Sequence, residues 1–383
     1  MPPVARFLAG ARVIAPEGLL DPGWVGVEGG LIVGAGSGEP PAGTDDVVDR
    51  IDGYLMPGFI DVHCHGGGGG SYTSADPEQV REAARTHLKH GTTTTNASLV
   101  AASHDDLVTQ VRALVPHVDD GTLHGIHLEG PWISPDYCGA HDPAVLRPPD
   151  PAEVADILAA GEGRIAMVTL APELPGALES VEIIVASGAV AAVGHTAATA
   201  DDVRRAVEAG ATVATHLFNA MPPLLHRDPG PVGALLSDAR IRAEIICDGV
   251  HLSPDVAALV LSTGRAMLVT DAMAAAGAGD GRYRLGHLDV VVAGGEARLA
   301  DTGTLAGSTL FMDAAFRVAA EQARAGVVAA SRAASETPAL ALGLDDRGRI
   351  AAGQRADLVV MDDSLALSRV MRGGEWVRRD GDR

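Results

Sequence analysis

The chain has 383 residues, of which 46% are hydrophobic, and its formal net charge at pH 7 is −21. This composition is typical of a folded α/β protein with room for one large barrel and a smaller domain, and the negative charge argues against a nucleic-acid or anionic-membrane partner. Three widely spaced cysteines predict no disulfide framework, and the lack of a signal-peptide pattern or a long apolar run predicts a cytoplasmic protein.

Both ends of the chain carry short, β-prone segments broken by Gly or Pro. Near the start these are ARFLAGARVI, WVGVEGGLIVGAG and DVVDRIDG, and near the end they are ADLVVMD (356–362) and VMRGGEWVRR (370–379). The GG pair marks a hairpin turn. We therefore expect residues 1–54 and 346–383 to build one small β-sandwich domain together.

Between residues 55 and 345, strand and helix patterns alternate, which predicts an α/β fold of the (β/α)8 TIM-barrel type. We place the eighth strand at 266–271. The eight strand-containing segments are GFIDVHCH (58–65), GTTTTNAS (91–98), LHGIHLEG (123–130), IAMVTLAPE (165–173), AVAAVGHT (189–196), TVATHLFN (212–219), RAEIICDG (242–249) and AMLVTDAM (266–273).

The segments between these strands show helix signals. Ser103 and Thr199 fit N-caps with an acidic residue three positions later, and Ser253-Pro254 starts a helix that Gly264 should close. After the eighth strand, residues 282–307 form a β-rich insertion, and two Ala-rich helices follow at about 308–343.

Metal-binding side chains occur where five of these strands end. All strands of a barrel open onto the same face, so these side chains should converge. His-X-His on a strand would also point both imidazoles to one side. Imidazole and carboxylate ligands favour Zn²⁺, with Fe²⁺ as the alternative, and an open coordination position would suit a metal hydrolase. The candidates are His63, His65, Glu129, His195, His216 and Asp271.

Each candidate alone could have an ordinary structural role. Glu129 could be a solvated or helix-capping carboxylate, and His127, His195 and His216 could be hydrogen-bonded core histidines. Their joint position at strand ends favours the metal site. The single lysine, Lys89, excludes barrel enzymes that bridge two metals with a carbamylated lysine, such as dihydroorotase, hydantoinase and urease. Glu129 is the remaining bridging candidate.

Eight motifs, in this order, make the chain resemble the N-acetylglucosamine-6-phosphate deacetylases of the amidohydrolase superfamily. The resemblance spans about residues 55 to 310. HLEGPW together with THLFNAM is specific to the family, whereas GFIDVHCHG and ADLVVMD mark only the superfamily. The motifs are PGFIDVHCHG, HLEGPW, GAHDP, VGHT, THLFNAMPP, ICDGVH, VTDAM and GTLAGS.

The resemblance implies a role for each matching residue. It implies one divalent metal on Glu129, His195 and His216, with a second ion possible on His63 and His65. It implies that Asp271 is the catalytic acid/base and that Ala140 and His141 contact the acetamide. The sugar phosphate and sugar would be held by Asn219, Ala220, Arg227, Asp248, His251, Leu305, Ala306 and Gly307.

Some of these roles also have support from the residues themselves. Asn219-Ala220 follows a strand, where free backbone N–H groups can meet an anion, and Arg227 suits bidentate phosphate binding. The ordinary alternatives are a surface arginine for Arg227, a helix-start histidine for His251 and a loop-surface histidine for His141. Cys138 is most simply an incidental cysteine.

The expected reaction is hydrolysis of N-acetyl-D-glucosamine 6-phosphate to D-glucosamine 6-phosphate and acetate, in amino-sugar catabolism and cell-wall sugar recycling. Asp271 would accept the proton of the attacking water, and His141 would stabilise the oxyanion. Two alternatives remain open: deacetylation of another amino sugar phosphate such as the galactosamine epimer, and a non-catalytic barrel that only binds. The second is disfavoured because the ligand set is complete.

The loop MPPLLHRDPGPVG (221–233) is long and rich in Pro, and it carries Leu224 and Leu225 next to Arg227. Exposed leucines on such a loop suggest burial against a partner. We therefore expect a homodimer in which Arg227 serves the neighbouring subunit's site. The alternative is a loop that folds back over its own barrel.

Overall fold

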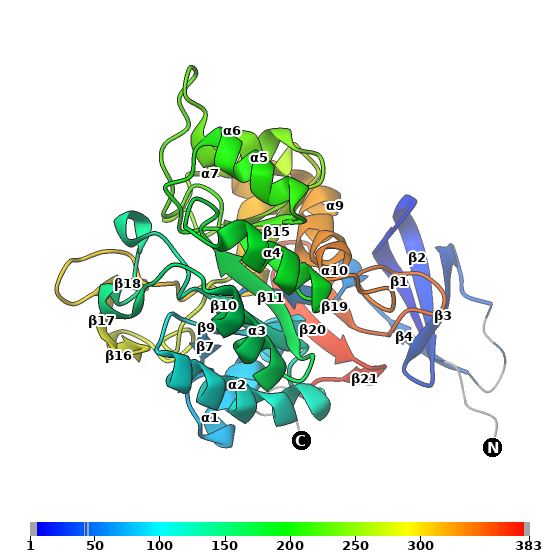
Figure 1. Ribbon diagram of the computed structural model, residues 1–383. Helices are drawn as coiled ribbons and strands as arrows, with labels where there is room; N and C mark the ends of the chain where they lie inside the picture. The colour runs from blue at the N-terminus through cyan, green and yellow to red at the C-terminus, as the bar shows by residue number, and fades with distance from the viewer. Residues whose placement is uncertain (1–5, 42, 44–45, 379–383) are drawn as a thin grey trace.

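The computed structural model describes residues 6–41, 43 and 46–378, and the structural statements below refer to these residues. The predictions for residues 1–5, 42, 44–45 and 379–383 lie outside them. Figure 1 shows a barrel wrapped by helices, with a smaller β-structure beside it that draws on both ends of the chain. The predicted fold class is confirmed.

The barrel contains eight parallel strands in sequence order. Side-chain and backbone hydrogen bonds join the last strand region to the first: Thr270 donates from N and Oγ1 to the Asp61 carboxylate at 3.2 and 2.6 Å, and the Asp271 amide donates to the His63 carbonyl at 2.9 Å. The strands are β6 (Phe59–Asp61), β9 (Thr92–Leu99), β10 (Gly125–Glu129), β11 (Ile165–Leu170), β12 (Val190–Val193), β13 (Val213–Ala214), β14 (Arg242–Ile246) and β15 (Ala266–Val269).

Several strands end earlier than the sequence pattern indicates. β15 stops at Val269 rather than at residue 271, and β6 stops at Asp61. The placement of His63 and His65 on a strand was therefore wrong. The Asp61 carboxylate accepts a hydrogen bond from the His63 amide at 3.3 Å, so a side chain rather than a neighbouring strand pairs with the backbone there. The two imidazoles converge because of this irregular backbone, not because of a strand pleat.

Helices follow the barrel strands and cover the outside of the barrel (Figure 1). Ser103 caps its helix, and Thr199 with Asp202 forms a complete capping box, as predicted. The helix capped by Ser253 ends at Leu261, three residues before Gly264. The helices are α1 (Pro77–Lys89), α2 (His104–Asp119), α3 (Pro151–Ala160), α4 (Ala177–Ala186), α5 (Ala200–Glu208), α6 (Gly230–Ser237) and α7 (Pro254–Leu261).

The small β-structure joins both ends of the chain in one eight-stranded sheet. β5 pairs antiparallel with β19, which ties the beginning of the chain to its end. Leu8, Val25, Leu55 and Leu358 belong to a buried core separate from that of the barrel. The strands are β1 (Arg6–Ala15), β2 (Gly18–Glu28), β3 (Leu31–Ser37), β4 (Val47–Arg50), β5 (Tyr54–Pro57), β19 (Leu358–Met361), β20 (Leu367–Arg372) and β21 (Glu375–Trp376).

The predicted insertion is a three-stranded antiparallel sheet of β16 (Gly281–Leu285), β17 (Leu288–Ala293) and β18 (Glu296–Leu299). Leu285 and Leu299 pack with Val100 and Met273, so the insertion lies over the rim of the barrel. Two helical runs follow at 312–322 and 326–341, each containing a short π-helical turn. Among the described residues, no helix combines the length and the apolar character that a bilayer crossing requires.

Candidate active site

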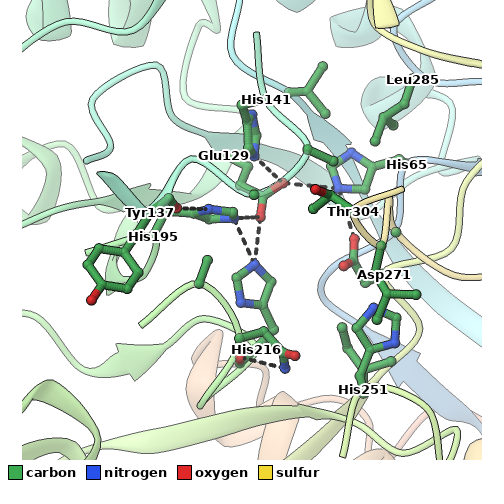
Figure 2. A pocket seen from close by; sticks show the side chains of 18 of the residues that line it. His65, Glu129, Tyr137, His141, His195, His216, His251, Asp271, Leu285 and Thr304 are labelled. Carbon is green, nitrogen blue, oxygen red and sulfur yellow. Dashed lines mark hydrogen bonds and ion pairs between the residues drawn. The ribbon is translucent and has the colours of Figure 1, made fainter. Parts of the chain in front are cut away.

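The six candidate metal ligands lie together at the end of the barrel where the strands terminate, and Figure 2 shows five of them: His65, Glu129, His195, His216 and Asp271. Glu129 is the last residue of β10, whereas His195, His216 and Asp271 each lie two residues beyond their strands. These last three have positive φ angles of 47°, 24° and 48°, which non-glycine residues rarely adopt. Such strain is concentrated at functional sites, where the surrounding structure holds it in place.

Glu129, His195 and His216 form the first cluster. The Nε2 atoms of His195 and His216 lie 3.0 and 2.9 Å from Glu129 Oε1, and 3.0 Å from each other. All three side chains are buried. His195 Nδ1 lies 2.9 Å from the Tyr137 carbonyl, which can only accept, so Nδ1 carries the proton and Nε2 presents a lone pair to the cluster.

His63 and His65 form the second cluster, with Asp271. Their Nε2 atoms lie 3.2 Å apart, and His65 Nε2 lies 3.1 Å from both Asp271 Oδ1 and Glu129 Oε2. His65 Nδ1 donates to the Ser98 carbonyl at 3.1 Å, so its Nε2 faces the centre, where it can carry a proton or bind a metal ion. Glu129 lies between the two clusters, in the position of a bridging ligand.

A divalent cation fits this arrangement. Lone pairs and carboxylate oxygens that face one another at about 3 Å repel unless positive charge lies between them. Tetrahedral ligands at Zn–N distances of ~2.0–2.1 Å would stand roughly 3.3 Å apart. Burial lowers the pKa of His65, but the bonds to Asp271 and Glu129 outweigh it and raise the pKa to about 9. A site that attracts protons this strongly also attracts a metal ion.

His141 lies within 3.4 Å of Glu129 Oε2 but has the opposite proton arrangement. Its Nδ1 accepts the backbone amide of Ala101 at 3.1 Å, so Nε2 carries the proton. Burial lowers the pKa of His141 to about 4, and the ring is therefore neutral at pH 7. This histidine can donate a hydrogen bond into the site, whereas a metal ligand would need a free lone pair at that atom.

Asp271 faces the same centre from just beyond the end of β15. Burial raises the pKa of this carboxyl, but the charges of His63 and His65 and a hydrogen bond from His65 outweigh the burial and lower it to about 2. The carboxylate is therefore ionised at neutral pH and able to accept a proton.

A cavity of about 320 Å³ opens above these ligands, a size that suits a small organic substrate. Figure 2 shows Glu129, His195 and His216 on one side of it and Asp271 and His251 on the other. Of the predicted substrate residues, the structure brings seven to this cavity: Ala140, His141, Asn219, Ala220, His251, Leu305 and Gly307.

Three predicted substrate residues do not line the cavity. Ala306 is fully buried, and Asp248 contacts His251, whose Nδ1 lies 2.7 Å from Asp248 Oδ2. Burial lowers the pKa of His251, but the bond to Asp248 outweighs burial and raises it. Arg227 is exposed on its loop and does not reach the cavity of its own chain.

Glu244 was not among the residues that the sequence pattern indicated. It is fully buried in β14, and its Oε2 accepts from His63 Nδ1 at 3.0 Å and from the His216 amide at 3.1 Å. It therefore fixes ligands of both clusters. A carboxylate inside the apolar strand RAEII was the available signal. Leu285 and Thr304, which line the cavity from the insertion region, gave no such signal.

His127 has a structural role in this arrangement, and Cys138 does not line the cavity. The ring of His127 is buried between Ser98 Oγ at 2.9 Å and Thr169 Oγ1 at 2.8 Å, and burial lowers its pKa well below the usual value. It is a hydrogen-bonded core histidine. Cys138 is half-buried on the loop that leads to His141, and its thiol contacts the Gly139 carbonyl rather than the cavity.

The sequence and the fold are similar to those of known enzymes. The Amidohydrolase family profile matches residues 54–377. A Bos taurus N-acetylglucosamine-6-phosphate deacetylase is 41% identical over 344 residues, covering 84% of this chain and 83% of that protein. An Escherichia coli O157:H7 N-acetylgalactosamine-6-phosphate deacetylase is 34% identical over 380 residues, covering 97% and 99%. A solved structure of N-acetyl-D-glucosamine-6-phosphate deacetylase from Mycobacterium smegmatis matches with a TM-score of 0.93 at 47% identity, covering 97% and 100%.

Proposed function

The chain belongs to the amidohydrolase family, and from that premise we propose that it deacetylates N-acetyl-D-glucosamine 6-phosphate in amino-sugar catabolism and cell-wall sugar recycling. The products are D-glucosamine 6-phosphate and acetate. The observation that carries the proposal is the convergence of Glu129, His195 and His216 with an ionised Asp271 and the N–H of His141 around one cavity. The named relatives match over most of their length.

Glu129, His195 and His216 hold the principal divalent metal in this proposal, and His63 and His65 hold a second where two are bound. Imidazole and carboxylate ligands favour Zn²⁺, with Fe²⁺ as the alternative. When bound, the metal would lower the pKa of a water molecule and polarise the acetamide carbonyl. Glu244 and the Tyr137 and Ser98 carbonyls orient the imidazoles that bind it.

Asp271 and His141 handle the proton and the charge of the reaction. Asp271 takes a proton from the attacking water and later gives it to the departing amine, because its carboxylate is ionised and faces the centre. His141 donates from Nε2 to the carbonyl oxygen as negative charge develops there. A neutral imidazole suits this role because its proton is fixed on the atom that faces the substrate.

The sugar phosphate is held by Asn219, Ala220 and His251, with Leu305 and Gly307 against the sugar. We further infer a homodimer in which Arg227 completes the phosphate site of the neighbouring subunit. Leu224 and Leu225 on the same loop are 41% and 53% exposed, and Arg227 does not line the cavity of its own chain. The reaction belongs in the cytoplasm, because a charged sugar phosphate does not cross a lipid bilayer unaided.

Acetate release from four sugars tests the substrate assignment. The sugars are N-acetylglucosamine and N-acetylgalactosamine, each with and without the 6-phosphate. We expect N-acetylglucosamine 6-phosphate to give the highest kcat/KM. This value should exceed that of unphosphorylated N-acetylglucosamine by about two orders of magnitude or more, because charge-assisted contacts contribute ~1.5–3 kcal/mol each. Equal efficiency with and without phosphate would overturn the phosphate site.

The galactosamine epimer is the second candidate substrate. The Escherichia coli relative, which matches 97% of this chain, is named for that compound. The two sugars differ only in the direction of one hydroxyl group. A higher kcat/KM for N-acetylgalactosamine 6-phosphate in the same assay would assign the chain to that reaction instead.

A further inference from the structure

A second polar cavity, of about 530 Å³, lies at the opposite end of the barrel from the active site. Thr93 and Thr94 line it from the beginning of β9, and His124 lines it just before β10 begins. Glu129, by contrast, closes β10 at its other end. Arg372, at the end of β20, brings the small sheet to the same cavity. The cavity therefore lies where the barrel and the small sheet meet.

Three arginines line this cavity: Arg347, Arg355 and Arg372. Arg347 donates from Nη1 to the hydroxyl of Thr94 at 3.2 Å, and Arg372 donates from Nη2 to the Gly121 carbonyl at 2.6 Å. Thr94 is only 4% exposed, so this wall is a built part of the protein interior. Three guanidinium groups on one cavity stand out in a chain with a net charge of −21.

The carboxylates near this cavity do not satisfy all three arginines. Asp346 pairs with Arg347 at 2.8 Å, and Asp357 accepts from Arg355 Nε at 3.1 Å. Among the described residues, Arg372 has no ion pair. Its burial, with Arg355 and Arg347 nearby, lowers its pKa although Asp357 opposes them. An unpaired guanidinium that is partly withdrawn from water gains from an anion.

Two other ionisable residues line the cavity. Asp120 adds one negative charge on the exposed rim, where its carboxylate accepts the Thr122 amide at 2.8 Å. Burial and the charge of Arg347 lower the pKa of His124 to about 4, so this ring is neutral at pH 7. The lining therefore presents three cations and one anion, with unused N–H groups on Arg355 and Arg372.

We propose that this cavity binds the phosphate group of a small phosphorylated molecule. Guanidinium forks match phosphate oxygens bidentately, and the Thr93 and Thr94 hydroxyls add neutral partners. The cavity is larger than a phosphate ion requires, which leaves space for a polar organic part. Bound phosphate would join Arg372 of the small sheet to the barrel wall at Thr94. The site is separate from the active site and does not depend on the proposed reaction.

Titration calorimetry and thermal unfolding of the full chain with inorganic phosphate test this site, with sodium chloride at matched ionic strength as the reference. In the wild type we expect saturable binding and a rise in Tm of a few degrees. Arg372→Gln should weaken that binding at least about tenfold, because a charge-assisted contact is lost. Arg355→Gln gives the same test at a second arginine of the cavity, in case Arg372→Gln does not fold.

Two control variants show whether the phosphate binds in this cavity or elsewhere on the chain. Arg282→Gln removes an exposed arginine of β16 and should leave phosphate binding as in the wild type. His251→Ala disrupts the active-site cavity and should leave the second phosphate site intact. The proposal is overturned if phosphate acts no differently from chloride, if both arginine variants bind as the wild type does, or if His251→Ala alone abolishes the binding. None of these results depends on deacetylase activity.

Discussion

The position of one proton on each imidazole decides what the active-site histidines can do. His195 and His65 donate from Nδ1 to backbone carbonyls and direct Nε2 toward the centre, whereas His141 accepts a hydrogen bond from a backbone amide at Nδ1 and presents an N–H. Residue type alone does not distinguish these cases. The backbone groups of Tyr137, Ser98 and Ala101 create the distinction between a metal ligand and a hydrogen-bond donor.

Replacing Asp271 by Asn tests its role as the proton acceptor. The amide keeps the shape of the side chain but has no basic oxygen, so we expect kcat to fall by ~10²–10⁴ with KM largely unchanged. The measurement is steady-state acetate release, with the metal content of the variant determined in parallel. A kcat within about threefold of the wild type, well below the usual effect of losing a general base, would show that another group handles the proton.

The pair formed by His251 and Asp248 predicts a pH dependence. Asp248 raises the pKa of His251, so the imidazolium that attracts phosphate is present below this raised pKa and is lost as pH rises through it. In Asp248→Asn the pKa falls, and the loss should move to lower pH. The measurement is the ratio of kcat/KM for N-acetylglucosamine 6-phosphate to kcat/KM for N-acetylglucosamine, followed against pH in the wild type and in Asp248→Asn. We expect the fall in this ratio to occur at lower pH in the variant.

Taking this ratio removes the pH dependence of the chemical step, which both sugars share. Ionisation of the sugar phosphate itself affects wild type and variant equally, so the difference between their profiles belongs to His251. Identical profiles would contradict a role for the imidazolium in phosphate binding.

At the residue scale, the sequence indicated the candidate metal ligands that the fold brings together, because each lies at or just after the end of a recognisable apolar strand. It did not single out Glu244: the carboxylate inside the apolar strand RAEII was a signal, but its partners His63 and His216 lie 181 and 28 residues away in the chain. It also could not show that Asp248 contacts the His251 ring rather than the cavity. Such second contacts depend on which side chains the fold brings together, and a single sequence does not carry that information.

At the scale of elements, the candidate ligands lie just beyond the strands, except Glu129, which is the last residue of β10. His195, His216 and Asp271 each follow their strand by two residues and adopt positive φ. Hydrophobic pattern indicated that the strands exist but overestimated their length, because apolar residues continue into the turns that carry the site. The insertion and the helix caps were predictable, since their signals are local.

The loop at 221–233 predicts complementation between two inactive proteins. Arg227→Ala and Asp271→Asn chains are mixed, dissociated and reassembled. If Arg227 acts in the neighbouring subunit, a mixed dimer holds one site with both residues intact, and activity should recover to about a quarter of the wild-type value when chains pair at random.

A mixture of Glu129→Ala and Asp271→Asn is the matched control. Both residues belong to the same chain's site, so no mixed dimer of these two contains an intact site. If mixed dimers of the Arg227→Ala pair form and remain as inactive as the control, Arg227 does not act across the interface.

At the scale of the whole molecule, both chain ends meet in one sheet beside the barrel, which their shared β-prone character predicted. The division into units at residues 54/55 and 345/346 stays a prediction. β5 (Tyr54–Pro57) belongs to the small sheet, so the strand pairing itself changes after Pro57. The arginine-lined cavity between the two parts was not predictable, because Thr94, His124 and Arg372 are far apart in sequence.

Metal binding should also stabilise the folded chain. Removing the metal with a chelator leaves buried imidazoles and carboxylates facing one another, so we expect Tm to fall by several degrees and to recover when Zn²⁺ is added. Differential scanning calorimetry measures this change, and Glu129→Ala serves as the comparison because it should respond little to either addition. A wild-type Tm that is insensitive to the chelator while the metal is removed would contradict the coupling.

Elemental analysis of protein purified without added metal tests the central claim most directly, with wild type, His63→Ala and Glu129→Ala measured side by side. The wild type should carry at least one divalent ion per chain, and His63→Ala should lose at most one. Glu129→Ala should lose the principal ion and should no longer release acetate from the substrate. Wild-type metal content in Glu129→Ala would contradict the assignment of this cluster as the metal centre.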